Sequence, residues 1–256
     1  MMKQQWQIFL VALAFFTRIP IPADTPYSPD RLNQANRYFA LVGIVVGLIS
    51  AVAFWLAHCL FPAPIAVLIA MATSLLVTGA FHEDGLADVF DGFGGGWEPA
   101  QKLDIMKDSR LGTYGAAALF VALAMKWASL TALADVNPMY TVIALISLHG
   151  LSRAVAASLI VSYPYVRLDE QSKVKPLANQ QSPQDLWVLI FTSLIILLFL
   201  PLSVAVALTV VLLLVRNLCG RWFQRQLGGY TGDCLGAAQQ IAELCGYLVL
   251  LTMVAH

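Results

Sequence analysis

The segment FHEDGLADVFDG (residues 81–92) holds three aspartates whose spacing suits metal binding. Asp84, Asp88 and Asp91 occupy positions i, i+4 and i+7, so on an α-helix their side chains lie within about 60° of one another on one face. Like charges on one face repel each other, and a divalent cation relieves that repulsion. Because Mg²⁺ prefers carboxylate and phosphate oxygens, we predict that the three aspartates are magnesium ligands and catalytic residues. The structural alternative is a solvated helix end with Asp84 as its cap.

Two candidate general bases directly precede the first of these aspartates. His82 and Glu83 both carry side chains that accept protons in enzyme active sites. The sequence does not decide which of the two acts, so both are candidate catalytic residues.

A second motif, DIMKDSRLGTYG (residues 104–115), combines acids with bases. Asp104 and Asp108 form another i, i+4 pair, and Lys107 and Arg110 lie beside them. Arginine offers a planar fork for phosphate oxygens and lysine a point charge, so these two residues are predicted to bind a diphosphate. Asp108 is a further catalytic candidate, as a metal ligand or an activator of the nucleophile. The alternative is a salt-bridged amphipathic surface helix.

A third polar motif, TGDCLG (residues 231–236), opens the last apolar segment. Asp233 enters that segment as either a substrate-binding residue or a helix N-cap. Glu243 lies further along the same predicted helix, with Gln240 between them and roughly on the same face. An acid in an apolar helix is costly in lipid, so Glu243 is a candidate substrate-binding residue.

Two cations also lie within apolar segments, where each costs a few kcal/mol at the centre of a bilayer. Lys126 is interpreted as a residue that snorkels or pairs with another helix. Arg153 is a candidate for substrate binding, with a structural partner as an equal alternative. His58 and His149 are interpreted as packing residues.

The composition is that of a multi-pass membrane protein. Of 256 residues, 59% are hydrophobic and 12% are charged, against about 25% charged in soluble domains. The mean hydropathy is +0.74. The net charge is zero, so nothing indicates binding to nucleic acid. The four cysteines show neither zinc-site spacing nor a disulfide framework.

The apolar segments predict an all-α, polytopic membrane helix bundle in one domain covering residues 1–256, with about seven spans. A short N-terminal helix over residues 5–19 is too short to span and is predicted to be interfacial or re-entrant. A polar loop over 23–36 and a short amphipathic helix near 98–108 are also expected. The predicted spans are residues 38–60, 65–82, 114–134, 139–162, 187–200, 202–216 and 235–254.

The distribution of charge predicts the orientation. Apart from Lys126 and Arg153, every Lys and Arg lies at the N-terminus or in alternate loops, and the turns between those loops carry none. The positive-inside rule places the basic loops in the cytoplasm of a bacterium, at its inner membrane. The three motifs then face the cytoplasm together. From these residues alone, we predict a site that uses Mg²⁺ in displacement at phosphorus.

The motifs also carry a specific resemblance. FHEDGLADVFDGFGGG, KLDIMKDSRLGTYG and GYTGDCLGAAQQIAE, with FFTRIPIP near the N-terminus, resemble the cobalamin synthase (adenosylcobinamide-GDP ribazoletransferase) family from about residue 8 to the end. The resemblance implies transfer of adenosylcobinamide phosphate from adenosylcobinamide-GDP to α-ribazole or its 5′-phosphate. The products would be adenosylcobalamin or its phosphate and GMP, with Mg²⁺ as cofactor, in the last step of nucleotide loop assembly.

The expected partners are these two substrates, the lipid bilayer and other enzymes of nucleotide loop assembly, while homo-oligomerisation is left open. Two alternatives remain at this point. A CDP-alcohol phosphotransferase would begin its motif with the same D-G-x-x-A pattern, but Asp88 stands where that family has Arg. A membrane transporter would use Lys126, Arg153 and Glu243 as a polar path, but it leaves the acidic motifs without a purpose.

Overall fold

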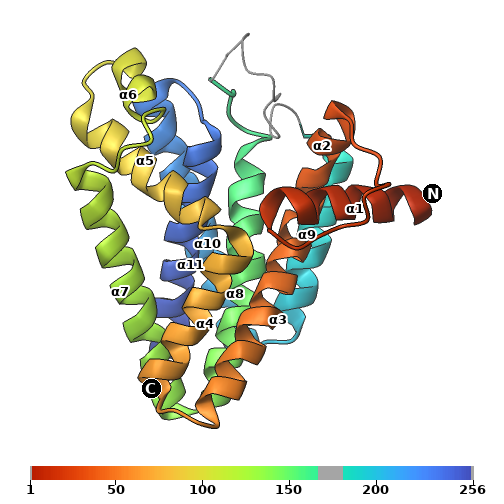
Figure 1. Cartoon of the computed structure of the whole chain (residues 1–256), viewed down its shortest axis with the longest axis vertical. Helices are drawn as coiled ribbons and strands as arrows, with labels where there is room; N and C mark the ends of the chain where they lie inside the picture. The colour runs from red at the N-terminus through yellow and green to blue at the C-terminus, as the bar shows by residue number, and fades with distance from the viewer. Residues whose placement is uncertain (1, 167–180, 255–256) are drawn as a thin grey trace.

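The computed structural model describes residues 2–166 and 181–254, and these form a bundle of helices (Figure 1). The basic residues Arg167, Lys173 and Lys175 lie outside the described residues. Within them, β-structure is limited to one bridge between Tyr165 and Tyr230. In chain order the helices are α1 Met2–Phe16, α2 Pro29–Ala35, η1 Asn36–Tyr38, α3 Phe39–His58, α4 Ala63–Thr78, α5 Phe81–Gly95, α6 Pro99–Ile105, α7 Thr113–Val136, α8 Pro138–Leu159, α9 Pro183–Leu198, α10 Leu202–Leu227 and α11 Gly232–Val254.

The all-α membrane architecture is confirmed, and the number of spans is lower than predicted. Among the described residues, five helices are long and apolar enough to cross a membrane, or six if α4 and α5 count as one bent span. The predicted span 65–82 ends at Thr78, where the chain bends by 86° into α5. Helix α9 has 16 residues, which reach only about 24 Å against a hydrocarbon core of about 30 Å.

Two other expectations about the elements need correction. The predicted loop over 23–36 contains α2, because Ser28 caps the helix and Pro29 occupies its first turn. Helix α10 continues well beyond the predicted end at residue 216 and stops at Gly228, whose φ of +77° is left-handed. The short helix expected near 98–108 is confirmed as α6. Helix α1 runs across the direction of the long helices (Figure 1).

Helices α8 and α11 form the centre of the bundle. Buried residues make up 72% of the apolar window of α8 and 67% of that of α11, compared with 28% for α7 and α10. Gly43 and Gly47 of α3 lie directly against the backbone of α8. A Cβ on Gly47 would be 2.6 Å from the carbonyl oxygen of Leu145, so only glycine permits this approach.

The bend between α4 and α5 sets the direction of the acidic motif. Gly79 and Ala80 have φ values of +67° and +56°, the left-handed conformation that turns the chain. The backbone N–H of Arg18 donates to the carbonyl of Val77 at 2.7 Å, and its side chain lies against Gly79. The N-terminal segment therefore holds the bend from which α5 leaves the bundle axis (Figure 1).

Candidate functional site

Helix α5 presents its polar residues in two directions. Asp84 is exposed and Asp88 is half-buried, whereas His82 and Glu83 are only 1% and 7% exposed. The predicted helix is confirmed, so Asp84 and Asp88 lie one turn apart at the rim of the bundle. The two candidate general bases instead face the interior.

Helices α5 and α11 cross in close contact at two glycines. A Cβ on Gly85 would lie 2.8 Å from the carbonyl oxygen of Asp233, and a Cβ on Gly236 would lie 3.2 Å from that of His82. This crossing brings Asp233 beside the aspartate-bearing face of α5. The predicted association of the first and third motifs is thus present in the fold.

Asp233 is not the N-cap of α11, contrary to the alternative raised from the sequence. The hydroxyl of Thr231 accepts the backbone N–H of Cys234 at 3.3 Å, which is the capping arrangement. Asp233 lies in the first helical turn, where a carboxylate interacts favourably with the helix dipole. Its side chain is half-buried.

Asp91 anchors the start of α7. Its two carboxylate oxygens accept the backbone N–H groups of Gly112 and Gly115, each at 2.8 Å. Both glycines lie so close to this carboxylate that a Cβ on either would collide with it. Asp91 therefore satisfies N–H groups at the N-terminus of α7 and fixes the preceding loop, residues 106–112, on α5.

A polar hollow of about 520 Å³ lies between α5, the 106–112 loop and the start of α7. Three of its lining residues, Asp91, Asp108 and Arg110, were predicted from the sequence as site residues. The lining is formed by Asp91, Gly95, Ile105, Asp108, Arg110, Leu111, Gly112, Thr113 and Tyr114. The structure thereby joins the first motif to the second.

Asp108 and Arg110 form an exposed, two-pronged ion pair in this hollow. The Arg110 Nε lies 3.0 Å from both carboxylate oxygens of Asp108, and Nη2 lies 2.5 Å from Oδ2. Hydrogen bonds from Arg110 lower the pKa of Asp108 from its ordinary value to about 2. So acidic a carboxyl is poorly matched to accepting a proton near neutral pH, and Asp108 instead holds the guanidinium in place.

The other residues of the second motif lie around this pair. Lys107 and Asp104 are exposed at the end of α6. Lys102 is buried, and its Nζ donates to the side-chain oxygen of Gln226 at 2.6 Å, which ties α6 to α10. Lys107 therefore lies beside the hollow with the chemistry predicted for phosphate binding, although it does not line it.

His82 and Glu83 contact the core instead of the rim. The imidazole of His82 stacks on Phe39 with ring centroids 5.6 Å apart, and its Nε2 is buried without a partner among the described atoms. Glu83 Oε1 accepts from Gln240 at 2.9 Å. The role of either residue as a general base stays a prediction.

A buried polar network centred on Glu243 links α5, α7, α8 and α11. Lys126 Nζ of α7 lies 2.5 Å from Glu243 Oε1, and the side chains are 4% and 1% exposed. Tyr247 donates to the same oxygen at 2.8 Å, and Gln239 donates to the other at 2.5 Å. Gln239 and Gln240 extend the network to Glu83. The interpretation that Lys126 pairs with another helix is confirmed.

Arg153 and His149 of α8 lie beside this network and bond to each other, so the interpretation of His149 as a packing residue alone is wrong. Arg153 Nη1 lies 3.0 Å from His149 Nδ1 and 2.9 Å from its carbonyl oxygen. Arginine can only donate, so Nδ1 accepts and the 3.5 Å contact from Nδ1 to Glu243 is not a hydrogen bond. Neither Arg153 nor Glu243 lines the polar hollow, and their predicted role in substrate binding stays untested.

The predicted three-aspartate magnesium site stays a prediction. Within residues 2–166 and 181–254, no group of three or more His, Cys, Asp or Glu side chains is arranged to hold a metal ion. Both oxygens of Asp91 already accept backbone N–H groups. Asp84 and Asp88 nevertheless fit the usual mode of Mg²⁺ binding, in which one or two protein carboxylates act together with substrate phosphates.

Several interacting residues were not predicted from the sequence. Tyr247, Gln239 and Lys102 have ordinary positions on apolar or amphipathic helices, and only the packing of helices shows their partners. A signal did exist for the buried network, since Lys126 and Glu243 have opposite charges within separate predicted spans.

Comparisons with known proteins agree with the motifs. Residues 8–251 match the family model described as Cobalamin-5-phosphate synthase. A similar protein from Shewanella frigidimarina is 55% identical over 250 residues, covering 98% of this chain and 96% of that protein. One from Shewanella oneidensis is 53% identical over 255 residues, covering 98% and 97%. Both are named adenosylcobinamide-GDP ribazoletransferase. No solved structure matches the chain.

Proposed function

The chain belongs to the cobalamin-5-phosphate synthase family, and we propose that its ribazoletransferase reaction takes place at the rim where α5, the 106–112 loop and α7 meet. The reaction joins adenosylcobinamide phosphate, taken from adenosylcobinamide-GDP, to α-ribazole or α-ribazole 5′-phosphate. The products are adenosylcobalamin or its phosphate and GMP. The observation that carries this placement is the polar hollow, in which Asp108 and Arg110 lie beside Asp91 of α5.

Arg110 and Lys107 are the groups proposed to bind the diphosphate. The guanidinium of Arg110 is exposed and already held in a planar, two-pronged contact by Asp108. A diphosphate oxygen can accept the N–H groups of Arg110 that Asp108 leaves unused. Because Asp108 already fixes the guanidinium, the side chain loses less conformational entropy when the diphosphate binds. Asp108 is in this view a positioning residue.

Asp84 and Asp88 are the residues proposed to hold Mg²⁺ together with the diphosphate. When bound, the ion would neutralise charge on the phosphate oxygens and so favour attack at phosphorus. Asp91 then supports the site indirectly, because it holds the 106–112 loop against α5.

The bond changes are those of a single displacement. A ribose hydroxyl oxygen of α-ribazole attacks the phosphorus that carries the cobinamide, and the bond from that phosphorus to the bridging oxygen of GMP breaks. The hydroxyl proton needs an acceptor near the acidic face of α5. We assign this role to Asp233, because α11 places it beside Gly85, while Asp108 is too acidic and His82 faces the core.

The proposed location is the cytoplasmic face of a bacterial inner membrane. Two of the basic segments, residues 23–37 and 83–112, lie at the end of the bundle that carries α5 and α6, and the uncharged turn between α3 and α4 lies at the opposite end (Figure 1). Both substrates would then arrive from the cytoplasm, and the other enzymes of nucleotide loop assembly could meet the protein there.

The test is GMP release by the protein in liposomes, supplied with Mg²⁺, adenosylcobinamide-GDP and α-ribazole. Asp84→Asn should lower release to background while the protein still inserts. The matched control is Asp104→Asn, which removes an equally exposed acid that lies on α6 and not on the acidic face of α5. Full activity of Asp84→Asn, or equal loss in both variants, would remove α5 from the site.

A further inference from the structure

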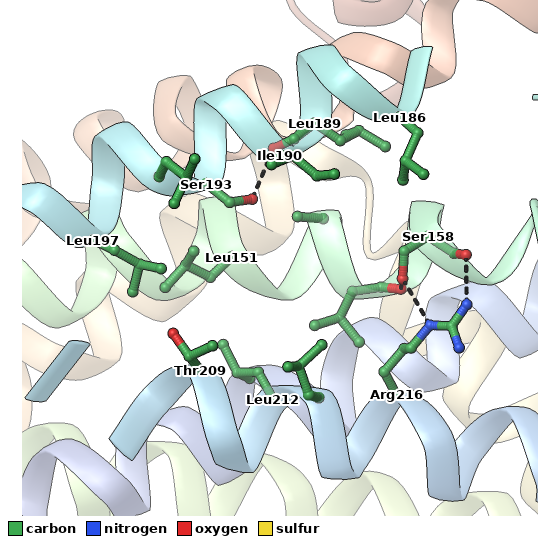
Figure 2. Close-up of a pocket in the computed structure, with 14 residues that line it drawn as sticks. Leu151, Ser158, Leu186, Leu189, Ile190, Ser193, Leu197, Thr209, Leu212 and Arg216 are labelled. Atoms are coloured by element: carbon green, nitrogen blue, oxygen red, sulfur yellow. Dashed lines mark hydrogen bonds between the residues drawn. The ribbon is translucent and has the colours of Figure 1, made fainter. Parts of the chain in front are cut away.

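An apolar groove lies between α8, α9 and α10 (Figure 2), and it shares no lining residue with the polar hollow. Helices α9 and α10 both pack on α8 but diverge from each other, leaving a space of about 290 Å³ between them. Leu151 of α8, Leu189 of α9 and Leu212 of α10 form its buried walls, at 3%, 2% and 5% exposure. Leu194 and Leu213 at its edges are 52% and 56% exposed, so the groove opens towards the membrane.

The middle of the groove offers no free polar group. Its two hydroxyls, Ser193 and Thr209, donate to carbonyl oxygens of their own helices, those of Leu189 and Ala205, at 2.8 and 2.7 Å. Every other residue along this stretch is aliphatic. Such a lining suits a hydrocarbon chain and excludes a polar ligand.

One end of the groove is cationic. Arg216 is the first charged residue of α10, and it points across the groove to α8 (Figure 2). Its guanidinium donates to the hydroxyl and carbonyl oxygens of Ser158, at 3.3 and 3.1 Å, and to the hydroxyl of Ser162. Among the described residues these oxygens and the Asn217 side chain are its hydrogen-bond partners, and no carboxylate pairs with it.

The surrounding charge favours an anion at this end. Helix α10 carries Arg216, Arg221 and Arg225 and no acidic residue. The acid at the start of α9, Asp185, is already paired with Arg37 at 2.6 Å. A phosphodiester would complete the arginine fork that the two serine hydroxyls hold in place.

The length of the groove and its apolar lining suit an acyl chain. Along α9 it runs from Leu186 to Leu197, about 16 Å at 1.5 Å per residue, which equals about half of a 30 Å hydrocarbon core. One acyl chain of one leaflet fits, with its head group at Arg216.

We propose that this groove binds one glycerophospholipid of net negative charge, with an acyl chain between α9 and α10 and its phosphodiester on the Arg216 guanidinium. The site is independent of the proposed transferase site, because none of its lining residues lies in the polar hollow. The lipid would fill the space between two helices that scarcely touch and so hold α9 against the bundle.

The test uses the full-length protein in detergent, titrated with palmitoyl-oleoyl phosphatidylglycerol and observed by native mass spectrometry. The native protein should retain one lipid, and Arg216→Gln should bind it at least tenfold more weakly. Arg221→Gln is the matched control, since it removes an equal charge from the same helix outside the groove and should bind as the native protein does. Ala154→Phe, which fills the groove floor and keeps the arginine, should also lose the lipid.

Four results would overturn the proposal. The first is that Arg216→Gln and Arg221→Gln bind the lipid equally well, and the second is that Ala154→Phe still retains it. The third is that the native protein binds phosphatidylethanolamine with the same acyl chains as tightly as phosphatidylglycerol. The fourth is a protein dimer that Ala154→Phe abolishes, which would make a second copy the occupant. If Arg216→Gln does not fold, the comparison of Ala154→Phe with the native protein decides the question.

Discussion

The ion pair between Lys126 and Glu243 should be the strongest single link between α7 and α11. The two atoms are 2.5 Å apart and both side chains are almost fully buried. With Arg153 and Glu83, the network contains two cations and two anions. Replacing either Lys126 or Glu243 alone leaves one uncompensated charge inside the bundle, which typically costs about 3–5 kcal/mol.

The perturbation is therefore a double-mutant cycle of Lys126→Met, Glu243→Gln and both together. At roughly 2–4 °C per kcal/mol for a chain of this size, each single variant should lower the Tm by roughly 6–20 °C. The double variant restores charge balance and keeps an oxygen for the Tyr247 hydroxyl. It should be more stable than either single variant, with a coupling energy of at least about 2 kcal/mol.

The assay is thermal unfolding of the purified protein in one detergent, with Tm read from intrinsic fluorescence. The control is the same cycle at Asp108→Asn and Arg110→Gln, an exposed pair whose coupling energy should be at most about 1 kcal/mol. Additive losses at Lys126 and Glu243 would refute the reasoning, because they would mean that the two charges do not compensate each other.

Three further outcomes are expected. Gly85→Ala should destabilise the protein by roughly 2 kcal/mol in thermal unfolding, because the added Cβ meets the backbone of α11. The control, Gly232→Ala, should be neutral because its Cβ meets nothing within 4 Å, and equal effects of the two variants would contradict the close crossing of α5 and α11. Asp108→Asn should raise the KM for adenosylcobinamide-GDP without moving the pH profile in the neutral range. The pKa of Asp108 is lowered to about 2 in the folded protein, below its value in the unfolded chain. The ion pair is therefore fully present above the unfolded pKa and is lost only as the pH falls through about 2. A shift in the acidic limb of the pH–activity profile on Asp108→Asn would contradict the assignment. Ala80→Gly should raise stability by about 1 kcal/mol by relieving a left-handed alanine, and a lower Tm would count against strain at this bend.

Much of the architecture follows from the sequence, because the length and hydrophobicity of a segment are enough to indicate a membrane helix. Helices α3, α7, α8 and α11 begin and end within a few residues of the predicted spans. The helical spacing of Asp84, Asp88 and Asp91 is equally predictable, since the period of an α-helix is a local property. The three motifs are also long enough to indicate the family by themselves.

The local pattern could not show how these three aspartates would divide their roles. Their common helix face depends only on spacing, but the N–H groups that Asp91 accepts belong to Gly112 and Gly115, more than 20 residues away. The bend at Gly79 and Ala80 ends the predicted span 65–82 at Thr78 and turns the acidic helix α5 away from it, because backbone conformation at two residues redirects everything after it. In the same way, the apolar neighbours of His149 in the chain favour a packing role, and only the fold places Glu243 beside it.

The sequence by itself determined that this is a helical membrane protein of a phosphotransfer family, since hydrophobic length and motif identity are properties of a single chain segment. Only the tertiary structure decided which acids remain at the rim, which one anchors a helix and which balance buried cations. That division depends on contacts between α5, α7, α8 and α11, and the energy of a buried charge is set by its partners and not by its neighbours in the chain.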